Sequence, residues 1–242
     1  MKPIKPVLLE IQKPIVGNAD VASSEAIMVT TYSELQELIA QLSILNKRYV
    51  LYFRGQKEDY TSDDNAKKRK SSFYPTIFRG TLSSGESDIR WHKLDYASKR
   101  LVEEVVKEGL AKDNINILKR KHLLQWSILQ HYEVTGTPLI DVTQSLRVAC
   151  SFAMLNESLE NNEAWSYLYV FGLPYVNHRI SVDSEEYLTN IRLLSIAPAE
   201  AKRPYFQEGF LICEDVVQKE YVVKSELDLN KPHDDNKHTK HV

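Results

Sequence analysis

The chain has 242 residues, 43% of them hydrophobic, which can build a substantial core in one large domain or two small ones. Lysine and arginine total 31 against 33 aspartates and glutamates, and the net charge of -2 excludes a general attraction to nucleic acids or acidic membranes. Apolar runs of membrane-spanning or signal-peptide character are missing, which predicts a cytoplasmic, reducing location. Cys150 and Cys213 lack zinc-ligand spacing, and we expect two buried thiols rather than a disulfide.

The first part of the chain predicts an arm, a helix, a strand and a loop. Prolines interrupt residues 1–24, which we interpret as a flexible arm. A helix begins at Thr31 and can be capped by Thr31 or Ser33, and a strand rich in aromatic and branched residues covers 49–53. Residues 57–72 are almost all polar and include the basic run Lys67 to Lys70. A solvated loop is the main interpretation of this segment, and a nucleic-acid or phosphate contact is the alternative.

Apolar residues at helical spacing predict three helices in the middle of the chain. The first covers 92–110 and the second 115–130, where it leads into His131 and Tyr132. The third covers 145–155, after a loop that contains Gly136 and Pro138.

The remaining elements are predicted strands. The continuous aromatic and aliphatic run 165–171 predicts a central strand covered on both faces. Shorter strands are expected over 176–182, 210–213 and 221–223. Together with the helices, they indicate a single α+β domain over 25–228, with a central, mostly antiparallel sheet flanked by helices. We expect residues 229–242 to be a disordered tail, and its histidines predict no metal site because no fold would fix their geometry.

Several common chemistries lack their sequence signatures. Gly80 and Gly85 have the spacing of a phosphate loop, but Glu86 stands before Ser87 where that loop needs lysine. The chain also has no dinucleotide-binding glycine pattern, no Gly-x-Ser-x-Gly elbow and no His-Glu-x-x-His zinc helix.

Three segments place polar residues where the surrounding sequence is typical of a core. Arg54 ends an apolar strand just before Gly55, and a guanidinium in that position can hold a phosphate or carboxylate from a rigid base. Asp141 is costly to bury unless it is paired, and Arg54 is its candidate partner. The three segments are Phe53-Arg54-Gly55-Gln56, Gln130-His131-Tyr132 with Thr137 to Ser145, and Gln207-Glu208-Gly209-Phe210.

With these segments the chain resembles the FRG domain family, named for the motif found here as Phe53-Arg54-Gly55. The likeness covers about Thr31 to Val223. Pro138 stands where the family often has arginine, and Val142 where it often has tryptophan. The missing arginine removes a second anion contact. Further matching blocks are Tyr74-Pro75 with Arg79, Gln130-His131-Tyr132, Leu139 to Thr143, Ala149 with Phe152-Ala153, and Gln207 with Gly209-Phe210.

The order of these blocks is similar to that of ADP-ribosyltransferases of the Arg-Ser-Glu class. The resemblance implies a transferase that moves ADP-ribose from NAD to a protein or nucleic acid, of the toxin or anti-phage effector type, with an antitoxin or immunity partner. Arg54 would grip the NAD pyrophosphate, Thr143 or Ser145 would position the ribose, and Glu208 would stabilise the cationic sugar or activate the acceptor. The other implied cofactor-binding residues are Gly55, Gln56, His131, Tyr132, Asp141 and Gln207.

Each role has a structural alternative. Arg54 and Asp141 can form an ion pair that only ties strand to loop, and Glu208 can be an exposed turn residue before Gly209. His131 can cap the C-terminus of its helix, and Thr143 or Ser145 can cap the N-terminus of the next. The alternative function is therefore a non-catalytic module that binds a nucleotide or a protein on the same scaffold.

Overall fold

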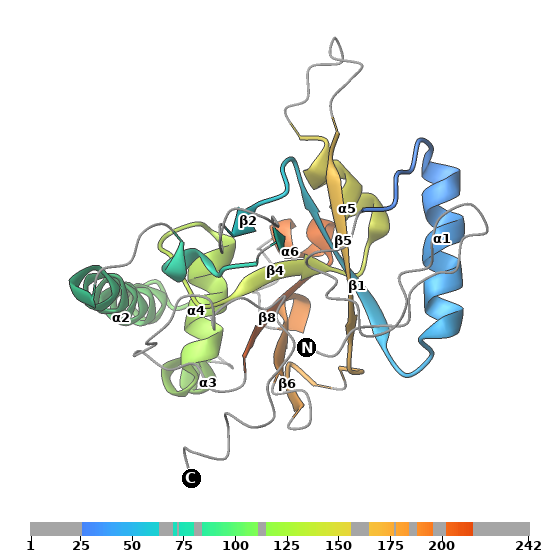
Figure 1. The fold of residues 1–242 in the computed structure, drawn as a ribbon. Coiled ribbons are helices and arrows are strands. Elements are labelled where there is room, and N and C mark those ends of the chain that lie inside the picture. The colour runs from blue at the N-terminus through green and yellow to red at the C-terminus, as the bar shows by residue number, and fades with distance from the viewer. Residues whose placement is uncertain are drawn as a thin grey trace, which may run out of the picture. The chain divides into compact units, whose positions relative to one another are not determined.

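The computed structural model describes residues 26–62, 70–71, 73–79, 84–110, 115–155, 165–176, 178–183, 188–195 and 202–214 (Figure 1). The predicted N-terminal arm, the strand over 221–223, the tail and residues 67–69 of the basic run lie outside this part of the chain. Within it the fold is mixed α+β, as predicted, and the strands pair antiparallel. The described residues fall into two compact units. The first runs up to Phe73 and from Ala149 to Tyr175, and the second comprises Tyr74 to Val148 and the residues from Val176 on.

The first unit contains the predicted N-terminal helix and strand. Helix α1 (Tyr32–Leu45) begins where expected, because the Thr31 hydroxyl accepts a hydrogen bond from the Glu34 amide at 3.2 Å. Strand β1 (Val50–Gln56) is longer than predicted and pairs with β5 (Tyr167–Leu173). The predicted 57–72 loop was wrong in part, since β2 (Thr61–Ser62) and β3 (Lys70–Ser71) form a short antiparallel ladder within it.

The prediction that 165–171 is a central strand was also wrong. Strand β5 stands at the edge of the order of described strands, and most of its residues are only half-buried. Its tyrosines explain the difference, because a tyrosine ring can pack while its hydroxyl reaches a polar partner. The Tyr169 hydroxyl donates to Asp59 Oδ1 at 2.6 Å.

The second unit combines a helical layer with a four-stranded antiparallel ladder. Its strands follow the order β4-β8-β7-β6. The helices and turns are η2 (Thr76–Phe78), α2 (Ser84–Lys107), α3 (Ile115–Arg120), α4 (His122–His131), η3 (Leu193–Ser195) and α6 (Lys202–Gln207). The strands are β4 (Ile140–Thr143), β6 (Ile180–Asp183), β7 (Leu188–Arg192) and β8 (Gly209–Glu214). Strands β4 and β7 and helix α6 had not been predicted. Helix α5 (Leu146–Ala153) crosses from the second unit into the first.

The predicted 115–130 helix is interrupted at Lys121, whose backbone is extended (φ -113°, ψ 97°). Neither proline nor glycine occurs there, so the sequence carries no breaking signal. The side chain of Gln125 compensates for the break. Its Nε2 atom donates to the carbonyl oxygen of Leu118 at 2.7 Å, a group at the end of α3 that has lost its helical partner. This buried hydrogen bond offsets part of the free-energy cost of interrupting the helix.

Two apolar clusters hold the second unit together. The first surrounds Trp91, whose ring meets Phe78 and Trp126 edge-to-face at centroid distances of 6.1 and 5.9 Å. The second packs Leu139 of the segment before β4 against β7 and β8, through Ile191 and Leu211. Cys213 belongs to this second cluster and is buried as predicted, whereas Cys150 is only half-buried, and neither forms a disulfide.

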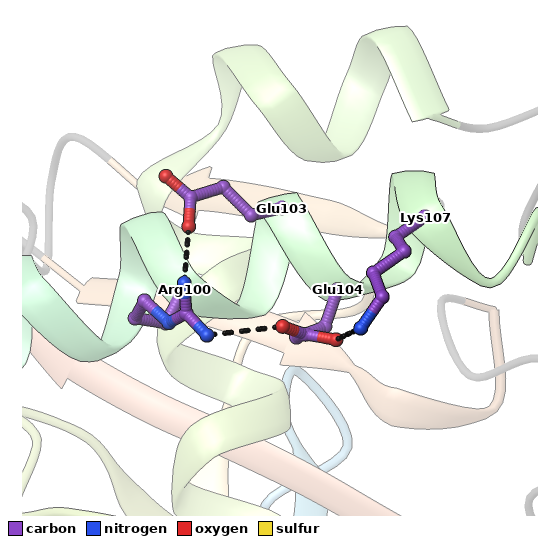
Figure 2. Close-up of polar contacts among 4 residues, drawn as sticks. All are labelled: Arg100, Glu103, Glu104 and Lys107. Atoms are coloured by element: carbon purple, nitrogen blue, oxygen red, sulfur yellow. Dashed lines mark hydrogen bonds and ion pairs between the residues drawn. The ribbon is translucent and has the colours of Figure 1, made fainter.

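Helix α2 begins eight residues before its predicted start, at Ser84 rather than His92. Its outer surface carries ion pairs at helical spacing, which Figure 2 shows: Arg100 with Glu103 and Glu104, and Glu104 with Lys107, at 2.9 to 3.2 Å. All four side chains are at least 46% exposed, so these pairs contribute little to stability.

Candidate functional site

Arg54 lies on one face of the β1–β5 pair among aromatic residues. Side chains alternate along a strand, so Tyr52, Arg54 and Gln56 share a face, and their register partners on β5 share it with them. We call this surface the Arg54 face. Arg54 is half-buried at its centre, opposite Tyr169. The Arg54 face consists of Tyr52, Arg54 and Gln56 with Tyr167, Tyr169 and Phe171.

Phe73 packs on one end of the Arg54 face. Its ring meets those of Tyr169 and Phe171 edge-to-face, at centroid distances of 4.4 and 5.3 Å. Asp59 also holds Tyr169, because its Oδ1 atom accepts a hydrogen bond from the Tyr169 hydroxyl. The strand and its packed aromatic neighbours therefore give Arg54 a rigid base, as the sequence predicted for this position.

The α-carbon of Gly55 lies on the opposite face of β1, against helix α5. A β-carbon on Gly55 would overlap the carbonyl oxygen of Ala149 and come within 2.7 Å of the amide nitrogen of Ala153. The glycine of the Phe-Arg-Gly motif thus allows the backbones of β1 and α5 to approach closely. This packing accounts for the residue by itself, and a ligand contact of Gly55 stays a prediction.

Gln56 is the most unusual polar residue of the Arg54 face. It is nine-tenths buried, and among the described residues its Oε1 atom has no hydrogen-bond partner. Buried side-chain oxygens are normally satisfied, because desolvation is costly without a hydrogen bond. The predicted role of Gln56 in ligand binding stays a prediction.

The second unit contains a hydrogen-bond network centred on Gln130, the penultimate residue of α4. Its Nε2 atom donates to Asp141 Oδ2 at 2.8 Å, and its Oε1 atom accepts from the hydroxyls of Thr137 at 2.7 Å and Thr76 at 3.2 Å. Asp141 is half-buried, and its carboxylate accepts a hydrogen bond from the Gln130 amide. Its predicted pairing with Arg54 stays a prediction. Thr137 lies in a polar segment singled out from the sequence but was given no role there. Thr76 was missed, since an isolated threonine carries no spacing signal.

His131 and Tyr132 follow Gln130 with different surroundings. His131 is 5% exposed, while Tyr132 is 49% exposed and meets the imidazole edge-to-face at 5.4 Å. Burial lowers the pKa of His131, and the positive charge of Arg203 lowers it further, against the opposing effects of Asp141 and Glu133. His131 is consequently neutral at pH 7 and offers a hydrogen-bonding ring rather than a positive charge for a phosphate.

Thr143 joins the end of β4 to the turn between α6 and β8. Its hydroxyl donates to the carbonyl oxygen of Gln207 at 2.8 Å and accepts from the backbone amide of Ser145 at 3.0 Å. The structure thus brings together three of the predicted site residues, Thr143, Ser145 and Gln207. Each of these hydrogen bonds joins the Thr143 hydroxyl to a backbone group, as in a contact that stabilises the fold.

Glu208 occupies the same turn and is exposed to solvent. Its φ angle of 44° lies in the left-handed region, which residues other than glycine enter at a cost. Gly209 follows with ordinary φ, and a β-carbon there would come within 2.9 Å of Leu193 Cδ1. The end of a leucine side chain can shift, so this contact does not by itself require glycine, and the left-handed position is held by Glu208.

Residues 49–162 match the model of the FRG domain. This segment is an FRG domain. The FRG domain includes β1 with Arg54 and β4 with Asp141 and Thr143, while Gln207 and Glu208 lie beyond the matched residues. The match is shorter than the resemblance from Thr31 to Val223. No curated protein and no solved structure gives a significant match to the chain.

Two further properties concern only the part of the chain that the structure describes. None of its helices is long and apolar enough to cross a membrane. Its histidines, cysteines and carboxylates form no group of three or more that could hold a metal ion.

Proposed function

We propose that the FRG domain binds NAD, with Arg54 holding the pyrophosphate on the Arg54 face. The observation that carries the proposal is the placement of a half-buried guanidinium on a strand whose neighbours are tyrosine and phenylalanine rings. A guanidinium matches phosphate oxygens with two parallel hydrogen bonds, and aromatic rings offer flat surfaces to a base.

Thermal unfolding with and without NAD tests this binding. NAD at 100 times its Kd should stabilise the protein by about 2.7 kcal/mol, which raises the Tm of a chain of this size by roughly 5 to 11 °C. Arg54→Ala should remove the shift. Arg48→Ala is the matched control, because Arg48 is an exposed arginine just before β1. If neither NAD nor any other nucleotide shifts the Tm of the wild type, the proposal is rejected.

ADP-ribosyl transfer is the second candidate function, and the strained backbone of Glu208 favours it. Cleavage of the bond between nicotinamide and ribose places positive charge on the sugar, which a carboxylate stabilises. The left-handed conformation is costly for glutamate, and such strain concentrates at functional positions. We propose that Glu208 supplies this carboxylate, and that the acceptor is a protein or nucleic acid of the host cell or of an invading phage.

Incubation of the protein with adenylate-labelled NAD and a cell lysate separates transfer from binding. Transfer predicts label on a macromolecule, lost in Glu208→Gln with NAD binding retained. The control Glu103→Gln changes an exposed glutamate of α2 and should leave labelling intact. A wild type that binds NAD but never labels an acceptor is a binding module.

A further inference from the structure

We propose that Gln56 is a specificity-determining residue that reads the amino edge of adenine in the bound nucleotide. This inference rests on the proposed NAD binding and assigns the part of the ligand that Gln56 recognises. Its starting point is the buried Oε1 atom of Gln56, which has no hydrogen-bond partner among the described residues.

The position of Gln56 on β1 links it to the proposed phosphate contact. It lies two residues beyond Arg54 on the same face, about 7 Å along an extended strand. One nucleotide can therefore contact both side chains, with its phosphate at Arg54 and its base at Gln56.

Tyr167 supplies a stacking surface for that base. It lies directly opposite Gln56 in the β1–β5 register and is half-buried. The β-carbons of such cross-strand pairs are about 5 Å apart, so a base stacked on the tyrosine ring presents its edge to the glutamine amide. Phe73 packs on Tyr169 and Phe171, which lie opposite Arg54 and Tyr52 in the register.

The chemistry of the amide selects adenine. An unsatisfied Oε1 atom needs a donor, and the 6-amino group of adenine is one. The glutamine NH₂ group can in turn donate to adenine N7, which gives the bidentate pairing by which glutamine reads adenine. Hypoxanthine has a carbonyl oxygen in place of the amine. This oxygen and Gln56 Oε1 are both hydrogen-bond acceptors, so they would repel each other. The N7 atom of hypoxanthine is unchanged and its N1 atom gains a hydrogen, so on the N6/N7 edge that Gln56 would contact only the 6-substituent differs.

The test compares the binding of NAD with that of nicotinamide hypoxanthine dinucleotide by calorimetry. NAD should bind the wild type about 5- to 150-fold more tightly. Gln56→Leu should bring the ratio close to one, mainly by weakening NAD. The matched control Gln36→Leu, at an exposed position of α1, should keep the wild-type ratio.

The possible outcomes separate this inference from the proposed function. Equal affinities of the wild type for the two dinucleotides overturn the reading of adenine and leave NAD binding intact. A preference that survives Gln56→Leu overturns the role of Gln56. If neither dinucleotide binds, NAD binding itself fails. The wild-type comparison needs no variant, so equal affinities overturn the inference even if Gln56→Leu does not fold.

Discussion

Replacement of Gly55 by alanine is the sharpest test of how the Phe-Arg-Gly motif is built. The added methyl group would overlap the carbonyl oxygen of Ala149 and lie 2.7 Å from the amide nitrogen of Ala153. Both atoms belong to the backbone of α5, which can retreat only by moving as a helix. The φ angle of Gly55 is not in the left-handed region, so the expected damage is steric rather than conformational.

Two opposing effects set the magnitude. Alanine restricts the unfolded chain and, at a site that tolerates it, stabilises a protein by about 0.4 to 1 kcal/mol. Overpacking of a tight interior costs typically 1 to 3 kcal/mol, and more where rigid backbone must shift. Contact with helix backbone places Gly55→Ala at the upper end. We therefore expect a net loss of about 2 to 3 kcal/mol and a Tm lower by roughly 4 to 12 °C.

Urea and thermal unfolding of purified protein measure this loss, and two other glycines calibrate it. A β-carbon at Gly85 meets nothing within 4 Å, so Gly85→Ala should be neutral or stabilising. Gly136 is intermediate, with its nearest contact 3.2 Å away at the Ile77 backbone nitrogen. If Gly55→Ala unfolds at the same midpoint as Gly85→Ala, the close packing of β1 on α5 is wrong.

Three further predictions concern stability. Thr137→Val should cost about 1 to 3 kcal/mol in urea unfolding, because the fully buried hydroxyl that it removes donates to Gln130. Burial and a nearby positive charge lower the pKa of His131 in the folded state, so the unfolded chain binds more protons as the pH falls through 6.5. The Tm should thus fall between pH 7.5 and 5.5, and His131→Gln should flatten this slope. Arg100→Ala should change the free energy of unfolding by less than about 1 kcal/mol, because its ion pairs are exposed (Figure 2).

Each of these has an outcome that contradicts it. A Thr137→Val protein as stable as wild type would mean that the Gln130 network contributes nothing. His92 is exposed, so His92→Gln is the control. If the Tm of His131→Gln depends on pH as steeply as that of His92→Gln, another group controls acid stability. A loss of several kcal/mol in Arg100→Ala would require the α2 ion pairs to act as a buried network.

Features that depend on local interactions could be predicted from the sequence. Thr31 predicted the start of α1 because its cap bond reaches only three residues. The apolar run before Arg54 predicted β1 and the rigid base of the guanidinium. The block motifs predicted the FRG domain, whose match includes β1 and β4.

Features that depend on partners distant in sequence became visible in the folded chain alone. The break at Lys121 needs the side chain of Gln125, and β7 exists because β8 and β6 lie on either side of it. From the sequence alone Gly55 resembles a turn residue, and its role becomes clear when α5, almost a hundred residues later, packs against it. Propensity and spacing describe a residue and its neighbours along the chain, whereas burial, register and close approach are set by the residues that folding brings into contact.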